Sequence, residues 1–98
     1  MAVADLVLDP AARSCERDGA PIGLTARELD LLEALMRRPS EVVTKRALLD
    51  DVWGHDFDGD ANIVEVYVGY LRRKIDAPFG RSSLQTVRGS GYRLVADA

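Results

Sequence analysis

The sequence predicts an α+β fold in which a small N-terminal antiparallel sheet, a three-helix core and a C-terminal β-hairpin follow one another along the chain. Three observations predict it. Residues 3–24 alternate apolar and polar side chains around a two-residue turn signal. Residues 25–75 repeat apolar side chains at helical spacing in three separate stretches. Two strand-like runs then flank a glycine-rich turn within residues 84–95. The 98 residues, of which 47% are apolar, suffice for a single domain, 1–98, with a hydrophobic core.

The N-terminal segment, residues 1–24, is expected to form three short strands. Asp18 and Gly19 are the strongest hairpin signal in the chain, because both central positions of a type I′ turn need a positive φ. Cys15 alternates with polar neighbours, so it is expected as a small apolar residue in a strand rather than a reactive thiol. A sheet of this size is unstable alone and must pack on the helices. The expected strands are residues 6–8, 13–17 and 21–24.

The first two helices of the core, residues 25–75, begin at threonine caps. Thr25 and Glu28 have the spacing of a capping box. Thr44 caps the second helix, which ends near Gly54. The link between them is short, so the two helices are expected to be neighbours. In the first helix the inward residues are Leu29, Leu32, Leu35 and Met36 with Leu31 at the edge, and in the second, from Lys45 to about Trp53, they are Leu48, Leu49, Val52 and Trp53.

The third helix, residues 62–75, has two contrasting faces. Its apolar stripe is Val64, Val68, Leu71 and Ile75. The opposite face carries Asn62, Val66, Gly69, Tyr70 and Arg73, a mixture unlike an ordinary solvated surface. The cations at 72–74 suit the flank of a helix that enters the major groove of DNA, but they also suit the C-terminal end of the helix dipole in a half-buried core helix, and this stretch alone favours the core helix.

A hairpin within residues 84–95 follows this helix and carries Arg88 at its tip. Its strands are expected at 84–88 and 92–95, with Tyr92 packing the hairpin onto the body of the domain. Three helices followed by such a hairpin make a winged helix-turn-helix, in which this hairpin is the wing.

The loop at 55–61 does not match a metal site. An EF-hand loop that starts at Asp56 needs glycine and glutamate where Ala61 and Tyr67 stand. His55 has no second ligand nearby and is expected on the surface. With one histidine, no nucleophile beside a base and no phosphate-cradling glycine loop, the chain is not expected to be an enzyme or to hold a cofactor or metal.

Charge is distributed unevenly along the chain. The formal net charge is −3, whereas a general nucleic-acid binder is usually basic. Residues 1–61 carry 7 Lys and Arg against 13 Asp and Glu, a balance of −6, and residues 62–98 carry 6 against 3, a balance of +3. Any binding of DNA is therefore expected on one face only. No apolar run has the length of a membrane span, so no membrane partner is expected.

Taken in order and at their spacing, several short motifs resemble a known family. They are residues 24–32, 43–49, 52–54, 64–68, 71–75 and 86–93. With these motifs the chain resembles, over essentially its whole length, the C-terminal DNA-binding domain of OmpR/PhoB-type response regulators.

The resemblance implies a parent transcription factor of a two-component system. The parent protein would also contain a receiver domain, which is absent from this chain and would receive the signal from a sensor kinase. Residues 62–75 would be the recognition helix, and two protomers would bind head-to-tail on a direct repeat in double-stranded DNA, in the cytoplasm. The loop at 54–61 would face RNA polymerase, through His55, Asp56, Phe57, Asp58 and Asp60.

The resemblance also implies which residues contact bases. Arg73 would read guanine, Val66 would meet a thymine methyl and Asn62 would read adenine, while Arg88 would enter the minor groove. Asn62 stands where family members often carry arginine, and Gly69 and Tyr70 replace a frequent basic pair. The expected base-contacting set is Asn62, Val66, Gly69, Tyr70, Arg73 and Arg88.

A second set is expected at the DNA phosphates: Lys45, Arg46, Tyr67, Arg72, Lys74 and Thr86. Lys45 and Arg46 would act together with the amides at the start of their helix. The alternative for Arg72 and Lys74 is a solvated helix end, and for Thr86 a simple strand preference. The alternative for the whole chain is a winged-helix module that binds a protein. The acidic total and the non-basic Gly69 and Tyr70 favour it slightly, whereas Arg88 and the cations at 72–74 oppose it.

Overall fold

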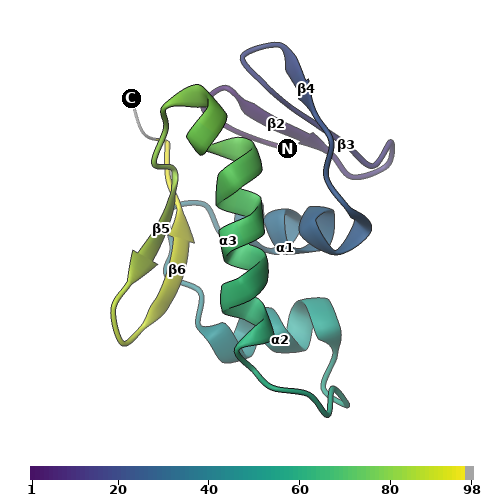
Figure 1. The fold of residues 1–98 in the computed structure, drawn as a ribbon, viewed down its shortest axis with the longest axis vertical. Coiled ribbons are helices and arrows are strands. Elements are labelled where there is room, and N and C mark those ends of the chain that lie inside the picture. Colours follow the sequence, from purple (N-terminus) through teal and green to yellow (C-terminus); the bar gives the residue numbers. More distant parts are fainter. Residues whose placement is uncertain (97–98) are drawn as a thin grey trace.

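The N-terminal segment folds into four antiparallel strands, one more than the sequence predicted (Figure 1). The computed structural model describes residues 1–96; residues 97–98, the end of the predicted domain, lie outside the described residues. The strands pair in the order β1-β2-β3-β4. Asp18 and Gly19 have φ values of 53° and 77°, which confirms the predicted turn. The bounds are β1 Ala2–Val3, β2 Leu6–Asp9, β3 Ser14–Arg17 and β4 Ala20–Ile22.

The three predicted helices are all present: α1 Ala26–Met36, α2 Lys45–Trp53 and α3 Ile63–Ile75. The capping box is confirmed, because Thr25 Oγ1 accepts from Glu28 N at 3.3 Å and Thr25 N donates to Glu28 Oε1 at 2.9 Å. Thr44 Oγ1 accepts from Ala47 N at 3.0 Å and caps α2 as predicted. Leu31, expected at the edge of α1, is fully buried, because the core joins α1 to the sheet as well as to the other helices.

The wing consists of β5 Leu84–Val87 and β6 Gly91–Leu94, and a short 3₁₀ helix, η1 Ala77–Phe79, precedes it. The link between α1 and α2 adds to this hairpin: Val43 N donates to Tyr92 O at 2.7 Å and Tyr92 N to Val43 O at 2.9 Å. A Cβ on Gly91 would lie 2.1 Å from Val43 O, so this close approach requires glycine. Tyr92 is buried, which confirms that it packs the wing onto the body.

A fully buried arginine ties the sheet to the end of α3. Arg17 Nη1 donates to Ile75 O at 2.6 Å and to Asp76 Oδ1 at 2.8 Å, while its Nε donates to Asp5 Oδ1 at 3.0 Å. Asp76 also accepts from Ser83 Oγ at 2.5 Å and from Leu84 N at 3.0 Å. Strand β3, the end of α3 and the start of the wing therefore meet in one hydrogen-bonded network.

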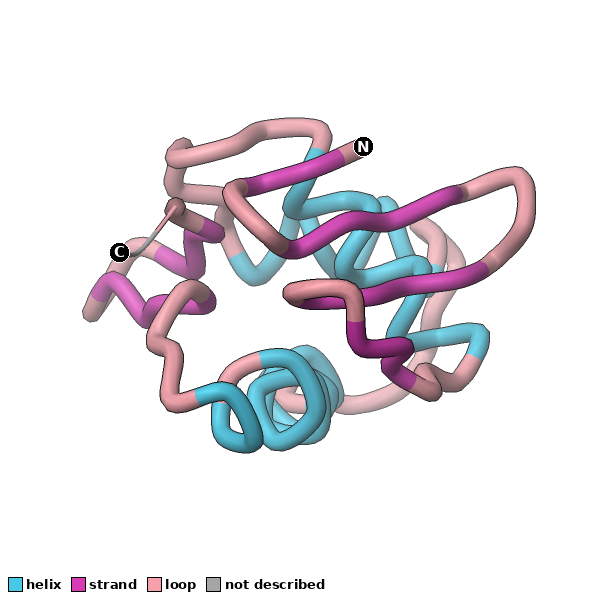
Figure 2. The backbone as a smooth tube through the Cα atoms, turned by 90° about the horizontal axis from the view of Figure 1, so that it is seen from above, coloured by secondary structure: helices cyan, strands magenta, loops and turns pink. Residues whose placement is uncertain are grey.

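Helix α3 lies on one side of the molecule. Figure 1 shows it crossing in front of α1 with the wing beside it, and Figure 2, which looks along α3, shows the N-terminal sheet and α1 on one side of it. This arrangement leaves the outer face of α3 and the wing together on one surface. Within residues 1–96, no helix is long and apolar enough to cross a bilayer.

Candidate nucleic-acid interface

The exposed face of α3 carries the residues that the sequence pattern placed opposite the core. Val64, Val68, Leu71 and Ile75 are buried, as predicted. Val66 and Tyr70, one turn apart on this face, are 44% and 41% exposed. Gly69 lies on the same outer face, and a Cβ there would meet no atom within 4 Å. The outer face of α3 is therefore apolar at its centre and open to a partner.

Arg73 and Arg88 are exposed cations with free guanidinium groups. Arg73 lies near the C-terminal end of α3, and Arg88 stands in the turn between β5 and β6. Neither makes a hydrogen bond or an ion pair with any of residues 1–96. Unpaired arginines can form bidentate hydrogen bonds to base edges or phosphates without first breaking an internal contact.

Asn62 is the N-cap position of α3 rather than its first helical residue. Lys45 Nζ donates to Asn62 Oδ1 and to Glu65 Oε1, both at 3.1 Å. Asn62 and Lys45 must therefore break these hydrogen bonds before they can contact DNA. Glu65, which sequence reasoning did not single out, places a carboxylate beside the candidate interface.

Arg72 joins α3 to the wing. Its Nε donates to Leu84 O at 2.9 Å, and its Nη2 donates to Thr86 Oγ1 at 2.6 Å. Both side chains were expected at phosphates, and here they bond to each other. No sequence pattern links residues 72 and 86, so this contact could not have been foreseen.

Lys74 pairs with a buried carboxylate instead of pointing into solvent. Its Nζ lies 2.7 Å from Glu28 Oε1, and Glu28 is only 3% exposed. Burial of Glu28 opposes its ionisation, but the hydrogen bonds from Lys74 and Thr25 outweigh this and lower the pKa of Glu28 below its usual value. Lys74 thus ties the end of α3 to the start of α1.

The start of α2 carries two further cations. Arg46 Nε lies 3.4 Å from Asp50 Oδ1, one turn along the helix, in a pair between an exposed arginine and a half-buried carboxylate. With Lys45, this arginine lies in the first turn of α2, where backbone amides and the helix dipole favour an anion.

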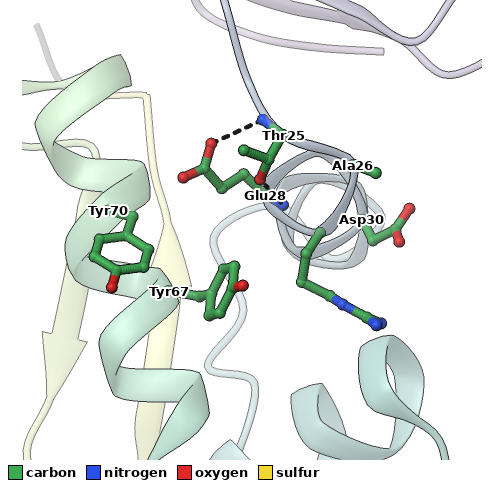
Figure 3. Close-up of a pocket in the computed structure, with 7 residues that line it drawn as sticks. Thr25, Ala26, Glu28, Asp30, Tyr67 and Tyr70 are labelled. Carbon is green, nitrogen blue, oxygen red and sulfur yellow. Dashed lines mark hydrogen bonds between the residues drawn. The ribbon is translucent and has the colours of Figure 1, made fainter.

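An aromatic series supports the exposed face of α3. Tyr70 packs edge-on against Tyr67 with ring centroids 5.3 Å apart, and Tyr67 packs on Trp53 at 5.4 Å. The guanidinium of Arg27 covers Trp53 at 5.4 Å. Figure 3 shows both tyrosines on α3 beside the first turn of α1, where they line a hollow of about 500 Å³ with Thr25 and Glu28.

The loop between α2 and α3 is acidic and largely exposed. Phe57 is the exception, since it is partly buried and packs near Trp53 with ring centroids 6.4 Å apart. Asp60 Oδ1 accepts from Asn62 N at 2.9 Å and so orders the start of α3. The His55 side chain is 84% exposed and lies 3.5 Å from Asp50, and Asp56 and Asp58 are exposed too. Among residues 1–96 no three His, Cys, Asp or Glu side chains converge as a metal site.

Comparison with known proteins gives a consistent result. A family described as "Transcriptional regulatory protein, C terminal" matches residues 19–94. The transcriptional regulatory protein TcrA of Mycobacterium tuberculosis is 50% identical over 93 residues, which are 95% of this chain and 37% of TcrA. The response regulator MprA of Mycolicibacterium vanbaalenii is 48% identical over 94 residues, 96% of this chain and 41% of MprA. The chain thus spans about two fifths of the length of these relatives.

Solved structures of similar proteins share the whole fold. The DNA-binding domain of CpxR from E. coli has a TM-score of 0.84 at 30% identity, covering 100% of this chain and 97% of that one. The DNA-binding domain of Klebsiella pneumoniae RstA, solved in complex with the RstA box, has a TM-score of 0.86 at 26% identity, covering 99% and 97%. These matches confirm the predicted winged helix-turn-helix.

Proposed function

The chain belongs to the family of transcriptional regulatory protein C-terminal domains, the output domains of OmpR/PhoB-type response regulators, and from that premise we propose that it binds a specific sequence of double-stranded DNA. The family is one of transcription-factor domains and not an enzyme class. The observation that carries the proposal is the pair of unpartnered arginines, Arg73 and Arg88, at the two elements that frame the exposed face.

In this proposal α3 enters the major groove and the wing enters the adjacent minor groove. Arg73 donates two hydrogen bonds to O6 and N7 of a guanine. Arg88 reaches into a minor groove that is narrow at A·T pairs, where the negative potential is highest. Asn62, Val66, Gly69 and Tyr70 complete the surface that contacts bases.

The phosphate contacts divide into two groups. Lys45 and Arg46 lie at the start of α2 and are proposed to bind one phosphate with the helix amides. The hydroxyl of Tyr67 is a further donor. Arg72, Thr86 and Lys74 are proposed to position α3 and the wing first and to contact phosphate second, because their polar groups already have partners.

The wider assembly is proposed from the family. Two protomers bind head-to-tail on a direct repeat, and the acidic loop, with His55, Asp56, Phe57, Asp58 and Asp60, faces RNA polymerase. A receiver domain in the parent protein takes the signal from a sensor kinase. The protein acts on DNA in the cytoplasm.

Selection from a random duplex library tests the function. The wild-type domain is expected to enrich a direct repeat, and Arg88→Ala is expected to lose the base preference at the wing position. Arg37→Ala is the matched control, since Arg37 is an exposed arginine at the C-cap of α1 whose partner is Glu33. Failure of the wild type to enrich any sequence at low salt would refute DNA recognition and favour the protein-binding alternative.

A further inference from the structure

We propose that Phe57, in the loop between α2 and α3, is a positioning residue for DNA recognition, which holds the outer face of α3 in place through Trp53 and Tyr67. The inference rests on the proposed DNA-binding function and deepens it. It gives the loop, whose exposed residues are proposed to face RNA polymerase, a second role in setting the affinity for DNA.

Phe57 is the inward residue of this loop. Between residues 55 and 60 the other five residues are exposed, whereas Phe57 is half-buried and packs against the hydrophobic core. Its backbone N donates to Gly54 O at 3.2 Å, which fixes the loop close to the end of α2. The ring of Phe57 is therefore less available to a partner of the loop than the side chains around it.

The ring of Phe57 is held by contacts with Trp53 and Gly59. The centroids of the two aromatic rings are 6.4 Å apart, with an interplanar angle of 58°. At the tip of the ring, a Cβ on Gly59 would lie only 2.4 Å from Cζ of Phe57. This distance is shorter than van der Waals contact, so an alanine at 59 would displace the ring. Glycine at this position therefore allows the loop to close over Phe57.

From Trp53 the ring contacts continue to the outer face of α3. Trp53 packs edge-on against Tyr67 with centroids 5.4 Å apart, and Tyr67 packs edge-on against Tyr70 at 5.3 Å. Aromatic pairs at these distances prefer particular orientations, so a shift of one ring changes the best position of the next. Tyr70 is exposed and belongs to the surface that is proposed to contact bases. A series of ring contacts thus links Phe57 to a side chain at the DNA.

The loop is also joined directly to the start of α3. Phe57 lines a hollow of about 260 Å³ together with Asp60, Asn62, Ile63 and Val66. Asp60 Oδ1 accepts from Asn62 N at 2.9 Å, and Asp60 O accepts from Ile63 N at 3.0 Å. The loop and the first turn of α3 therefore form one connected unit, so a displacement of Phe57 should also shift the start of α3.

Two substitutions disturb this packing in different ways. Phe57→Ala removes the ring, and Gly59→Ala pushes it out of place. Each is expected to lower affinity for the duplex that the wild-type domain selects by about tenfold. Affinity for a shuffled duplex of the same composition should change by less than about twofold, because phosphate attraction does not depend on the orientation of side chains on α3. Fluorescence anisotropy of labelled duplexes at fixed salt measures both affinities.

Trp53 provides a signal that separates positioning from stability. It is the only tryptophan in the sequence, so its fluorescence reports on the contact with Phe57. Phe57→Ala and Gly59→Ala should both shift the emission of the free protein. A role in stability alone would lower the melting temperature of the variants but leave the affinity of the folded protein unchanged. Circular dichroism establishes that each variant is folded.

His55→Ala is the matched control. It removes a highly exposed side chain from the same loop, so emission and both affinities should remain at the wild-type values. A double-mutant cycle then tests the route to α3. If Phe57 acts through the rings, Phe57→Ala and Tyr70→Ala together should cost less affinity for the selected duplex than the sum of their separate effects. Additive effects would overturn this route.

The outcomes separate the inference from the function on which it rests. Wild-type affinity for the selected duplex in both Phe57→Ala and Gly59→Ala would overturn the positioning role and leave DNA binding intact. An equal loss on the selected and the shuffled duplex, or an equal loss in His55→Ala, would also overturn it. If the wild-type domain selects no duplex at all, the proposed function and the inference are refuted together.

Discussion

Arg73 and Arg88 are the side chains on which sequence recognition depends most in this account. Each is exposed and makes no hydrogen bond or ion pair with residues 1–96, so removing it should leave the fold unchanged. We expect Arg73→Ala to lower affinity for the selected duplex by about 1–3 kcal/mol, with a smaller loss on unrelated sequences. Arg88→Ala should also lower specific affinity, and neither variant should shift the melting temperature appreciably. Titration with duplexes at constant salt, together with thermal melts, measures both effects.

The two assignments have a simple control. Arg37→Ala removes an arginine that is also exposed but lies outside the proposed contact set. If Arg73→Ala and Arg88→Ala bind the selected duplex as tightly as Arg37→Ala and the wild type do, neither arginine reads DNA.

Asp76 makes stability depend on pH. Burial opposes ionisation of Asp76, but hydrogen bonds from Ser83, Leu84 and Arg17 outweigh it, so its pKa lies below the ordinary 3.8. A carboxyl whose folded pKa is depressed contributes stability above the unfolded value, and this contribution is lost as the pH falls through the folded pKa. The free energy of unfolding, from denaturant titrations, should therefore decline as the pH falls below about 4.

Asp76→Asn isolates this contribution. At neutral pH the variant should be less stable by roughly 1.5–3 kcal/mol, because the buried Arg17 loses one of its two carboxylate partners and keeps only Asp5. Its stability should then fall less steeply in acid than that of the wild type. Parallel pH profiles of the two proteins would contradict the role given to Asp76.

Within helix α3, Gly69 is a position where one substitution should change stability and DNA affinity in opposite directions. Glycine within a helix costs about 0.5–1 kcal/mol relative to alanine, and the position is open. Gly69→Ala should therefore raise the free energy of unfolding by this amount while weakening binding of the selected duplex, because the added methyl stands on the outer face of α3 where DNA is proposed to approach. Chemical denaturation measures the free energy of unfolding, and a DNA titration on the same sample measures the affinity. A variant that gains stability and keeps full affinity would exclude close approach of DNA at Gly69.

The contact between α3 and the wing rests on Arg72. Its guanidinium bonds to both Leu84 O and Thr86 Oγ1, and an ammonium on a lysine side chain cannot reproduce this fork. Arg72→Lys keeps the charge, so a residue that only contacts phosphate should be little affected. We expect instead a clear loss of specific affinity that is not additive with Arg88→Ala, since both changes act through the wing.

A double-mutant cycle on the selected duplex tests this coupling. Additive effects of Arg72→Lys and Arg88→Ala would contradict the positioning role. A fall of about 0.9 in the slope of log K against log salt for Arg72→Ala, equal on all sequences, would instead support a phosphate contact.

The sequence predicted the elements better than the contacts between them. Helical spacing and threonine caps located α1, α2 and α3, because these signals are local. Strand β1 has only two residues and too little pattern to detect. Arg17 alternates with Cys15 on the buried side of β3, but its partner Asp76 lies 59 residues away, so a buried arginine was not foreseeable. Lys74 and Arg72 were expected at DNA for the same reason: their partners are set by tertiary structure.

Across the whole molecule, the charge pattern and the fold agree. The acidic half of the sequence, residues 1–61, includes the N-terminal sheet, α1, α2 and the loop before α3, and residues 62–98 carry the basic balance. Helix α3 and the wing, both from the basic part, share one surface (Figure 2). DNA is therefore expected on that surface only, with the acidic remainder directed away from the polyanion or toward a protein partner.

The most direct test of sequence-specific binding through this surface is a competition titration. The selected duplex competes against a shuffled duplex of the same length and base composition for the wild-type domain, at physiological salt. We predict that the selected duplex binds at least about 10³-fold more tightly. Equal affinity for the two duplexes would contradict the account, because phosphate attraction alone cannot distinguish them.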